Sequence, residues 1–172
     1  MPDNLILKSA LIAALFMTMS APALSREATV APAPNGIAIP KDYKTWQPLG
    51  VSHRTDKDSL RIILANPIAT KAATEGKTNP WPDGSMLAKL AWKDSTHPNF
   101  AAATVPGELT HVEFMIRDSK KFADTNGWGY ARWLGMEQKP YGNDAGFAQE
   151  CSTCHLQAKE TGYVFTRKAP LP

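Results

Sequence analysis

Apolar and polar residues alternate in three segments of the central part of the chain. The segments are SLRIILAN (59–66), SMLAKLAW (85–92) and THVEFMIRD (110–118). A period of two puts every second side chain on the same face of an extended strand, so each segment predicts a strand with one face on an apolar core. A fourth strand is predicted for WGYARWLG (128–135), which is rich in aromatic residues. The residues predicted to face the core are Leu60, Ile62, Leu64, Met86, Ala88, Leu90, Trp92, Val112, Phe114 and Ile116.

Turn and helix signals lie between and after these strands. Pro and Gly in NPWPDG (79–84) predict a turn, and STHPN (95–99) is predicted to open a loop. A helix is predicted over 66–76, because its Asn can cap it, its Pro fits the first turn and its Gly the end. A second helix is predicted from about Asn143 into the C-terminal part. The sequence therefore predicts an α+β fold that is mainly β, an antiparallel sheet with two or three helices.

The N-terminal segment has the pattern of a secretory signal peptide. Charged residues come first, an apolar run follows over 10–19, and small residues come next in SAPALS. We predict a signal peptide over 1–25, cleaved after Ala23 or Ser25, with a retained N-terminal anchor as the alternative. The apolar run is shorter than the about 20 residues that a membrane-spanning helix needs, and no later segment is apolar enough for one.

The composition of the remaining chain suits one compact domain. Of 172 residues, 43% are hydrophobic and 20% are charged, as in ordinary globular proteins. We predict a flexible, Pro- and Ala-rich leader over 26–36 and a single domain over 37–172. The net charge is +3 and the lysines are scattered, without the basic stripe that follows phosphates, which argues against a nucleic-acid partner.

The two cysteines of the chain lie in CSTCH (151–155), near its C-terminal end. A four-ligand zinc site would need two further ligands at suitable spacing, and a thioredoxin-like motif would need a βαβ pattern that this chain lacks. A disulfide across this short step would close a very small loop and stabilise little. The remaining histidines, which stand apart from one another in the sequence, are His53, His97 and His111.

The C-x-x-C-H motif instead predicts covalent attachment of one haem c. Cys151 and Cys154 would form thioethers with the two vinyl groups, and the fixed spacing would deliver His155 to the iron as axial ligand. Only 17 residues follow His155 and none is Met, so no downstream sixth ligand is evident. An iron without a sixth protein ligand is open to a small molecule. The motif therefore predicts a haem that binds or transforms a small molecule, rather than one that only carries electrons.

Three charged residues lie opposite the predicted core face. Arg61, Lys89 and Glu113 each fall in the middle of a predicted strand, with the side chain on the face away from the core. They can be solvated residues on the wet side of a sheet. If a haem lies on that sheet face, the same three residues can instead surround the open coordination position.

Several segments together resemble the cytochrome P-460 family. This is a family of periplasmic c-type haem proteins from ammonia- and methane-oxidising bacteria and their relatives, and its best-known members oxidise hydroxylamine. The order and rough spacing of the segments agree over most of the mature chain. The segments are IPKDYKTW, LRIILANP with Arg61, PDGSMLAK with Lys89, HVEFMIRDSKKFA with Glu113, GWGYARW, and ECSTCH followed by VFTR.

The resemblance implies a mainly β homodimer with an unusual cofactor. In this family a lysine nitrogen is joined to a meso carbon of the haem, and Lys89 matches that lysine. A desolvated lysine has a lowered pKa, which frees the nucleophilic amine that such a bond requires. Glu113 is our candidate for the base that accepts protons from hydroxylamine, and we expect burial to raise its pKa. Arg61 is expected to hold that carboxylate or to stabilise anionic intermediates.

We therefore expect a periplasmic enzyme that oxidises hydroxylamine to nitrous oxide or to products at the level of nitric oxide. A soluble carrier such as a small cytochrome would accept the electrons. The alternative is a protein similar to cytochrome c′-beta, which shares the fold, lacks the lysine bond, and binds nitric oxide or carbon monoxide under a phenylalanine cap. The phenylalanines considered for that cap are Phe100, Phe114 and Phe147. A plain electron carrier is the third possibility, and it would require a sixth protein ligand.

Overall fold

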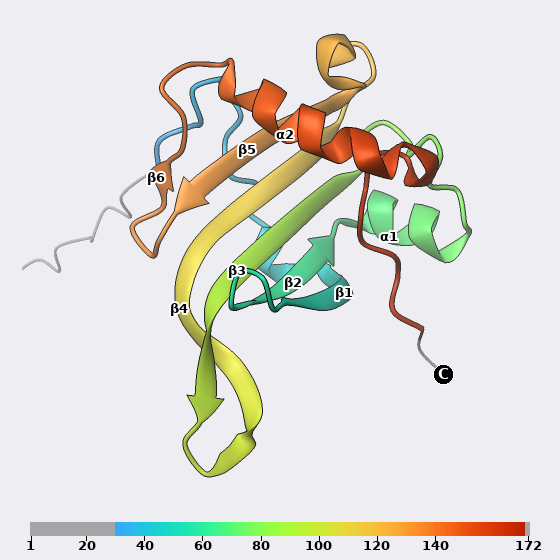
Figure 1. Ribbon diagram of the computed structural model, residues 1–172. Coiled ribbons are helices and arrows are strands. Elements are labelled where there is room, and N and C mark those ends of the chain that lie inside the picture. The colour runs from blue at the N-terminus through green and yellow to red at the C-terminus, as the bar shows by residue number, and fades with distance from the viewer. Residues whose placement is uncertain (1–29, 171–172) are drawn as a thin grey trace, which may run out of the picture.

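A computed structural model describes residues 30–170 of the chain. The described part contains one antiparallel sheet whose strands lie side by side in chain order, together with two α-helices and three short 3-10 helices (Figure 1). The strands are β1 (Gln47–Arg54), β2 (Ser59–Ala65), β3 (Met86–His97), β4 (Phe100–Arg117), β5 (Trp128–Leu134) and β6 (Lys139–Pro140). The helices are α1 (Pro67–Thr74) and α2 (Phe147–His155), with 3-10 turns η1 (Tyr43–Thr45), η2 (Ala123–Thr125) and η3 (Leu156–Thr161). The predicted α+β, mainly β fold is confirmed.

One face of the sheet packs on the apolar core that the alternation predicts. Val112 and Phe114 of β4 are each 1% exposed, and Ala88 of β3 is fully buried beside them. The cover over this face comes from the segment that precedes β1, through Ala33, Ile37, Tyr43 and Trp46. Tyr43 and Trp46 meet Phe114 edge to face, with ring centroids 5.2 and 6.4 Å apart. Burial of these large aromatic side chains fixes the face of each strand and therefore the register of the sheet.

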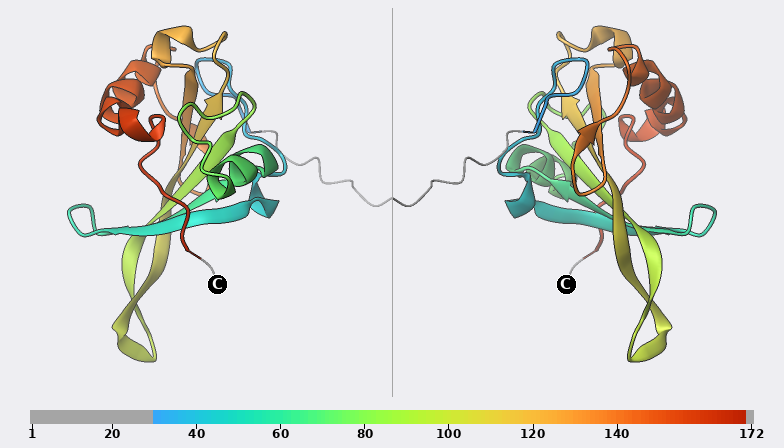
Figure 2. Two further views of the ribbon diagram at one scale, coloured as in Figure 1. Left: turned by 90° about the vertical axis from the view of Figure 1, so that its right-hand side faces the viewer. Right: turned by 90° about the vertical axis from the view of Figure 1, so that its left-hand side faces the viewer.

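The other face of the sheet carries a second apolar cluster at one end. It is formed by Leu49, Ile63, Ala65, Ala69, Ala72, Trp81, Leu87, Trp128, Tyr130 and Val164. The cluster is covered by α1 and by residues around α2, which crosses the ends of β3, β4 and β5 (Figure 1). Seen along the sheet, α2 and the N-terminal segment lie on opposite sides (Figure 2). The sheet is therefore covered on both sides at this end, whereas the alternation predicts only one apolar face.

The segment before β1 is packed from Ala31 onward. The Trp133 indole N–H donates to the Ala31 carbonyl at 2.9 Å, and the Asn35 amide donates to the Tyr130 carbonyl at 2.8 Å. Ala33 is 2% exposed. The described part of the leader predicted for 26–36 is thus joined to β5 at Ala31 and Asn35 and buried at Ala33, whereas Ala31, Pro32, Pro34 and Gly36 are exposed. The signal peptide predicted for 1–25 lies outside the described residues.

Helix α1 begins where the sequence predicts a cap. The Asn66 side-chain oxygen accepts from the backbone N–H groups of Ala69, at 2.9 Å, and Met86, at 3.0 Å. Its amide nitrogen donates to the Gly84 carbonyl at 2.8 Å. Asn66 is 4% exposed, so this one side chain both caps α1 and joins it to the start of β3. None of the helices in the described range is long and apolar enough to cross a membrane.

The loop predicted to open at 95–99 is wrong. Strand β3 continues to His97 and β4 starts at Phe100, so only Pro98 and Asn99 form the turn. The pairs Ser95 with Val105 and Thr96 with Thr104 continue the ladder beyond the main sheet. Their side chains lack an apolar alternation, because this part of the hairpin covers no core within the described residues. The hairpin projects from the sheet as an arm, which we define as residues 94–110 (Figures 1 and 2).

Two further elements differ from the sequence prediction, one in its existence and one in where it starts. Strand β1 was not predicted, because its Pro48 and Gly50 disfavour strands; a register shift lies between these two residues. Helix α2 starts at Phe147 rather than near Asn143. The Asp144 carboxylate accepts from the Gly146 N–H at 2.7 Å, and this local turn delays the helix.

Candidate functional site

A cavity of about 910 Å³ lies on the second face of the sheet, beside α2. Its walls come from strands β1 to β5, from α2 and from the segment after η3. The volume is within the range of cofactor pockets, about 300–1,000 Å³. The lining residues that carry charged, aromatic-hydroxyl, thiol or imidazole side chains are Arg54, Arg61, Lys89, Glu113, Tyr130, Arg132, Glu150, Cys151, Cys154, His155 and Arg167, and the neutral polar ones are Ser52, Gln157 and Thr166.

Helix α2 brings the C-x-x-C-H residues to this cavity. Spacings of three and four residues put Cys151, Cys154 and His155 on the same side of a helix, and all three line the cavity. Both cysteines are free thiols. Cys151 is partly buried and Cys154 is exposed, and burial raises the pKa of the Cys151 thiol.

The His155 ring is held in one orientation. Its Nδ1 lies 2.7 Å from the Tyr163 carbonyl oxygen, which can only accept, so Nδ1 carries the proton. The ring packs between Tyr130 and Phe165, with centroid distances of 5.2 and 5.0 Å. Burial lowers the pKa of His155, although the bond to Tyr163 opposes that shift. The result is a neutral imidazole whose Nε2 lone pair is available to a metal, as in proteins where the second ring nitrogen is anchored.

The sheet floor of the cavity carries a row of three charged residues. The register aligns Lys89 of β3 with Glu113 of β4, and Glu113 with Arg132 of β5. Lys89 Nζ forms an ion pair with Glu113 Oε2, and Nε and Nη2 of Arg132 each lie 2.5 Å from Oε1. The carboxylate therefore lies between two cations, each of which contacts a different oxygen.

The pKa of Glu113 is lowered to about 2, not raised as the sequence led us to expect. Burial does raise it, but the charges of Lys89 and Arg132 and the hydrogen bond from Lys89 together outweigh burial. The expectation was wrong because it took into account the burial of the carboxyl group but not the charges of Lys89 and Arg132 on the neighbouring strands.

Arg61 lies in the cavity but not on the carboxylate. Arg61 of β2 pairs with Ala91 of β3, which is two residues along the strand from Lys89. Its Nε is buried and has no hydrogen-bond partner, and no ion pair joins it to Glu113 among residues 30–170. Burial lowers the pKa of this guanidinium. Arg132, rather than Arg61, holds the Glu113 carboxylate.

Arg132 and His111 were not identified from the sequence, although the alternation contains a signal for each. In WGYARWLG, Arg132 is the charged residue on the face that also presents Trp128 and Tyr130. His111 precedes Glu113 by two positions and therefore shares its face. The His111 side chain is 22% exposed, and its Nε2 lies 3.6 Å from Glu113 Oε1.

None of the three phenylalanines considered as a cap directs its ring into the cavity, although Phe114 borders it. Phe100 is on the arm and 63% exposed, and the Phe114 ring is buried in the core on the opposite face. Phe147 packs against Tyr141, with centroids 6.1 Å apart, and belongs to the same core. Phe165 does line the cavity, but its ring packs on His155.

The residues of this cavity fit a c-type haem. The thiols and the His155 imidazole are presented together from one helix, at the spacing that thioether attachment requires. Two polar atoms of the lining, Tyr130 Oη and Arg61 Nε, are buried without a hydrogen-bond partner among the protein groups. Such orphaned atoms are expected where a polar prosthetic group completes a site. Within residues 30–170, no three or more His, Cys, Asp or Glu side chains are grouped so that they could hold a metal ion.

Comparison with known proteins agrees with this picture. Residues 40–166 match the family described as Cytochrome P-460, and the matched region covers most of the chain. It includes the strands that carry Arg61, Lys89, Glu113 and Arg132 as well as the C-x-x-C-H helix. A comparison with curated proteins gave no match. The extent of the family match, together with a C-x-x-C-H helix beside a cofactor-sized cavity, shows that the chain belongs to the cytochrome P-460 family of c-type haem proteins.

Proposed function

We propose that this protein is an exported c-type haem enzyme that oxidises hydroxylamine. One observation carries the proposal: a single cavity is bordered by Cys151, Cys154 and His155 on α2 and by the Lys89–Glu113 pair on the sheet. Family membership supports the haem, and the paired lysine and carboxylate support the reaction. The products proposed from the family resemblance are nitrous oxide or species at the level of nitric oxide.

In this proposal Cys151 and Cys154 hold the haem covalently, and His155 Nε2 binds its iron. When bound, the haem supplies a redox-active iron with a coordination position open to substrate. Met115 borders the cavity and packs against the second apolar cluster. We assign it to that cluster and not to the iron, since thioether side chains commonly fill irregular gaps in cores.

Lys89 is proposed to form the third covalent link to the haem, in which an N–C bond would replace one N–H bond of the lysine and the C–H bond of a meso carbon, and an external two-electron oxidant would take up the electrons. Its side chain is 29% exposed and its Nζ contacts the Glu113 carboxylate, which holds the nitrogen at the floor of the cavity; the nucleophilic amine that the link requires forms once this ammonium group gives up its proton. A linked nitrogen loses the ammonium charge, so one of the two cations beside Glu113 disappears. The pKa of Glu113 would then move upward, toward the range where a carboxylate works as a base.

Glu113 is proposed to accept protons from bound hydroxylamine, because oxidation of this substrate releases protons together with electrons. Arg132 positions the carboxylate, and its guanidinium stacks on the Tyr141 ring at 4.6 Å from the centroid. The orphaned Nε of Arg61 is available to stabilise an anionic group in the cavity.

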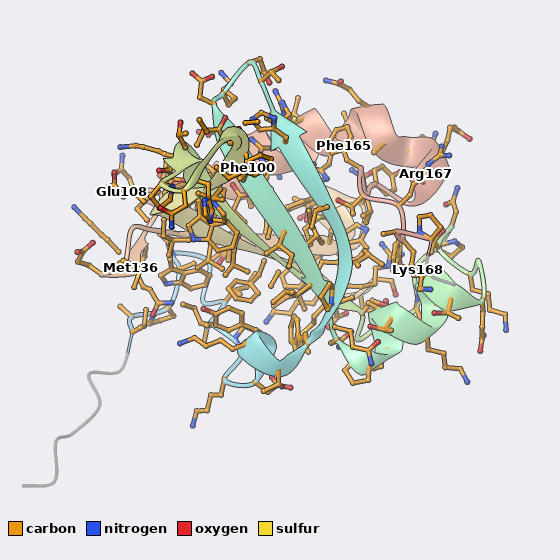
Figure 3. The ribbon with its side chains drawn as sticks, turned by 90° about the horizontal axis from the view of Figure 1, so that it is seen from below. Phe100, Glu108, Met136, Phe165, Arg167 and Lys168 are labelled. Atoms are coloured by element: carbon orange, nitrogen blue, oxygen red, sulfur yellow. The ribbon has the colours of Figure 1, made fainter. Side chains whose placement is uncertain are left out.

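We propose that the protein works in the periplasm and passes electrons to a small soluble cytochrome. The N-terminal signal pattern supports export. Phe165, which packs on the His155 ring, is 53% exposed and thus offers an aromatic surface next to the iron ligand. Arg167 and Lys168 follow it along the same segment, apart from Phe100 and Glu108 on the arm (Figure 3).

A homodimer is proposed, with the arm as the contact between the two copies. Pairing of β3 with β2 stops at Lys93, and pairing of β4 with β5 starts at His111. Both outer edges of the arm therefore lack a strand partner within residues 30–170. A two-stranded ribbon is only marginally stable alone, and an open edge favours association with another strand. A second copy of the chain supplies a matching arm.

The activity is tested with the purified, haem-loaded protein and a soluble dye as electron acceptor. We expect acceptor reduction that depends on hydroxylamine, and its loss in Cys151→Ser/Cys154→Ser. Tight binding of nitric oxide without any hydroxylamine-dependent reduction would instead support the alternative similar to cytochrome c′-beta. That alternative expects a phenylalanine ring over the iron. The Phe100 side chain is instead exposed on the arm, and the rings of Phe114 and Phe147 lie in the core on the opposite face.

A further inference from the structure

The hydrogen bonds around His111 define its tautomer. The Thr110 hydroxyl donates its one proton to the Ala91 carbonyl at 2.9 Å. The 3.1 Å contact between Thr110 Oγ1 and His111 Nδ1 must then be donated by Nδ1–H. A neutral imidazole has a single N–H, so His111 Nε2 carries a lone pair.

That lone pair faces another acceptor. His111 Nε2 is buried without a hydrogen-bond partner, and it lies 3.6 Å from Oε1 of the Glu113 carboxylate. Two acceptors that face each other repel, and one proton placed on either atom converts the contact into a charge-assisted hydrogen bond. The His111–Glu113 pair is therefore one proton short of a complete hydrogen-bond arrangement.

We propose that the His111–Glu113 pair stores the proton that leaves the substrate and that His111 hands it to solvent. This inference rests on the proposed function, since it takes Glu113 as the base. An N–H or O–H bond of hydroxylamine breaks and an O–H bond forms on Glu113. The proton then passes to His111 Nε2, and the imidazolium returns to its neutral form by releasing a proton to water at the exposed part of its side chain, which is 22% exposed as a whole. The electrons would be taken up by the soluble acceptor.

Charged groups from every neighbouring strand act on His111. Glu113 on β4 favours its protonation, whereas Lys89 on β3, Arg132 on β5 and Arg61 on β2 oppose it. Burial is the largest influence, and the pKa of His111 falls from 6.5 to about 4. The residue is thus neutral at rest and able to accept a proton.

The first test compares His111→Gln with His53→Gln in hydroxylamine oxidation. Gln keeps a polar atom near the Nε2 position but cannot take up a proton. His53 is a matched control, because it also contacts a carboxylate, Asp94 Oδ2 at 2.6 Å, and lies on β1, which does not pair with the strand that carries Glu113. We expect kcat to fall at least about tenfold in His111→Gln, with KM unchanged and a larger solvent isotope effect. Imidazole in the medium should restore turnover in His111→Ala. Turnover of His111→Gln equal to that of His53→Gln would overturn the inference.

The second test needs no substrate. Reduction of the iron adds negative charge to the cavity and raises the proton affinity of nearby groups. With a pH-indicator dye, we expect measurable proton uptake on reduction in the wild type and in His53→Gln, and a smaller uptake in His111→Gln and His111→Asn. If proton uptake is smaller in the two His111 variants but none of the proteins oxidises hydroxylamine, the result would support proton storage by the His111–Glu113 pair and contradict the proposed function. Equal proton uptake in all four proteins would contradict the proposal that the His111–Glu113 pair stores a proton.

Discussion

At the scale of single residues, the Glu113 carboxylate is the group whose behaviour is most determined by its neighbours. It receives one cation from each adjacent strand, and those charges lower its pKa to about 2 despite burial. A carboxylate this acidic holds a proton only briefly. In the proposed mechanism, loss of the Lys89 charge would raise the pKa of Glu113, and transfer to His111 would take the proton away from it, so the three residues would act together.

Replacement of Glu113 by Gln tests its role as a base. The amide keeps the shape of the side chain and removes the proton acceptor. We expect turnover with hydroxylamine to fall about 100-fold, a typical contribution of general base catalysis. Haem attachment, read from the absorption spectrum, should be unchanged. The control is Glu108→Gln on the arm, whose carboxylate pairs with Lys93 and is 69% exposed. Equal turnover in both variants would clear Glu113 of this role.

His111 predicts how stability depends on pH. Its pKa is about 4 in the folded protein and 6.5 ordinarily, so the unfolded chain binds more protons between these values. Stability is fully present above pH 6.5 and is lost as the pH falls toward 4. The loss approaches about 1.4 kcal/mol per pH unit at most. Urea unfolding should show a flatter dependence in His111→Gln over this window, and an unchanged slope would contradict the assigned environment.

Sequence reasoning at this scale succeeded where spacing alone determines the geometry. Cys151, Cys154 and His155 share one side of a helix at any position in a fold, so the motif could be interpreted directly. Arg132 and His111 could not be identified in this way, because their importance depends on cross-strand register with Glu113. Register is set by the burial of aromatic residues on the opposite face, which a single strand does not reveal.

At the scale of elements, Asn66 connects α1 with β3 through three hydrogen bonds. Asn66→Ala should therefore lower the free energy of unfolding by about 2 kcal/mol, at the upper end for loss of a helix cap, because buried partners are left unpaired. Asn143→Ala, at an exposed position before α2, is the control. Equal stability of the two variants, measured by thermal unfolding, would show that the cap contributes little.

The arm predicts the oligomeric state. Phe100→Glu places a charge on its exposed surface, and we expect the dissociation constant of the dimer to rise at least about tenfold, or 1.4 kcal/mol. Met136→Glu is the matched control, because Met136 is 74% exposed and lies in the turn between β5 and β6, whereas Phe100 lies where β4 begins, next to the hairpin turn of the arm. Sedimentation of both variants gives the comparison. An unshifted dimer in Phe100→Glu, or a wild-type monomer, would contradict the arm as the interface.

Strands with a buried apolar face were predictable, and the arm and β1 were not. The alternation in 59–66, 85–92 and 110–118 reflects burial, so it marked the strands that border the core. The arm covers no core within residues 30–170, and its Ala, Thr and Ser side chains carry no periodic signal. Its strands are held by backbone pairing, which the sequence does not display.

At the scale of the whole molecule, the sheet separates two environments. One face is filled by the N-terminal segment and its aromatic side chains, and it supplies the rigid support. The other face is apolar at one end and charged further along, and α2 covers the boundary between them. The cofactor-sized cavity lies next to α2, because the strands of the sheet extend beyond the part of this face that the second apolar cluster covers. This division explains why α+β class was predictable, whereas the place of the cavity required the assembled structure.

The central claim is a haem joined to Cys151, Cys154 and Lys89, with His155 below the iron and no protein ligand above it. Absorption spectra and intact masses of the wild type, Lys89→Leu and Lys93→Leu test it most directly; Lys93 lies on the same strand and is 64% exposed. We predict one haem per chain in all three, with a red-shifted ferrous band and two fewer hydrogen atoms in the wild type and in Lys93→Leu than in an unlinked adduct. Lys89→Leu should show an ordinary haem c spectrum. Identical spectra in all three proteins, or a six-coordinate iron in the resting wild type, would contradict the account.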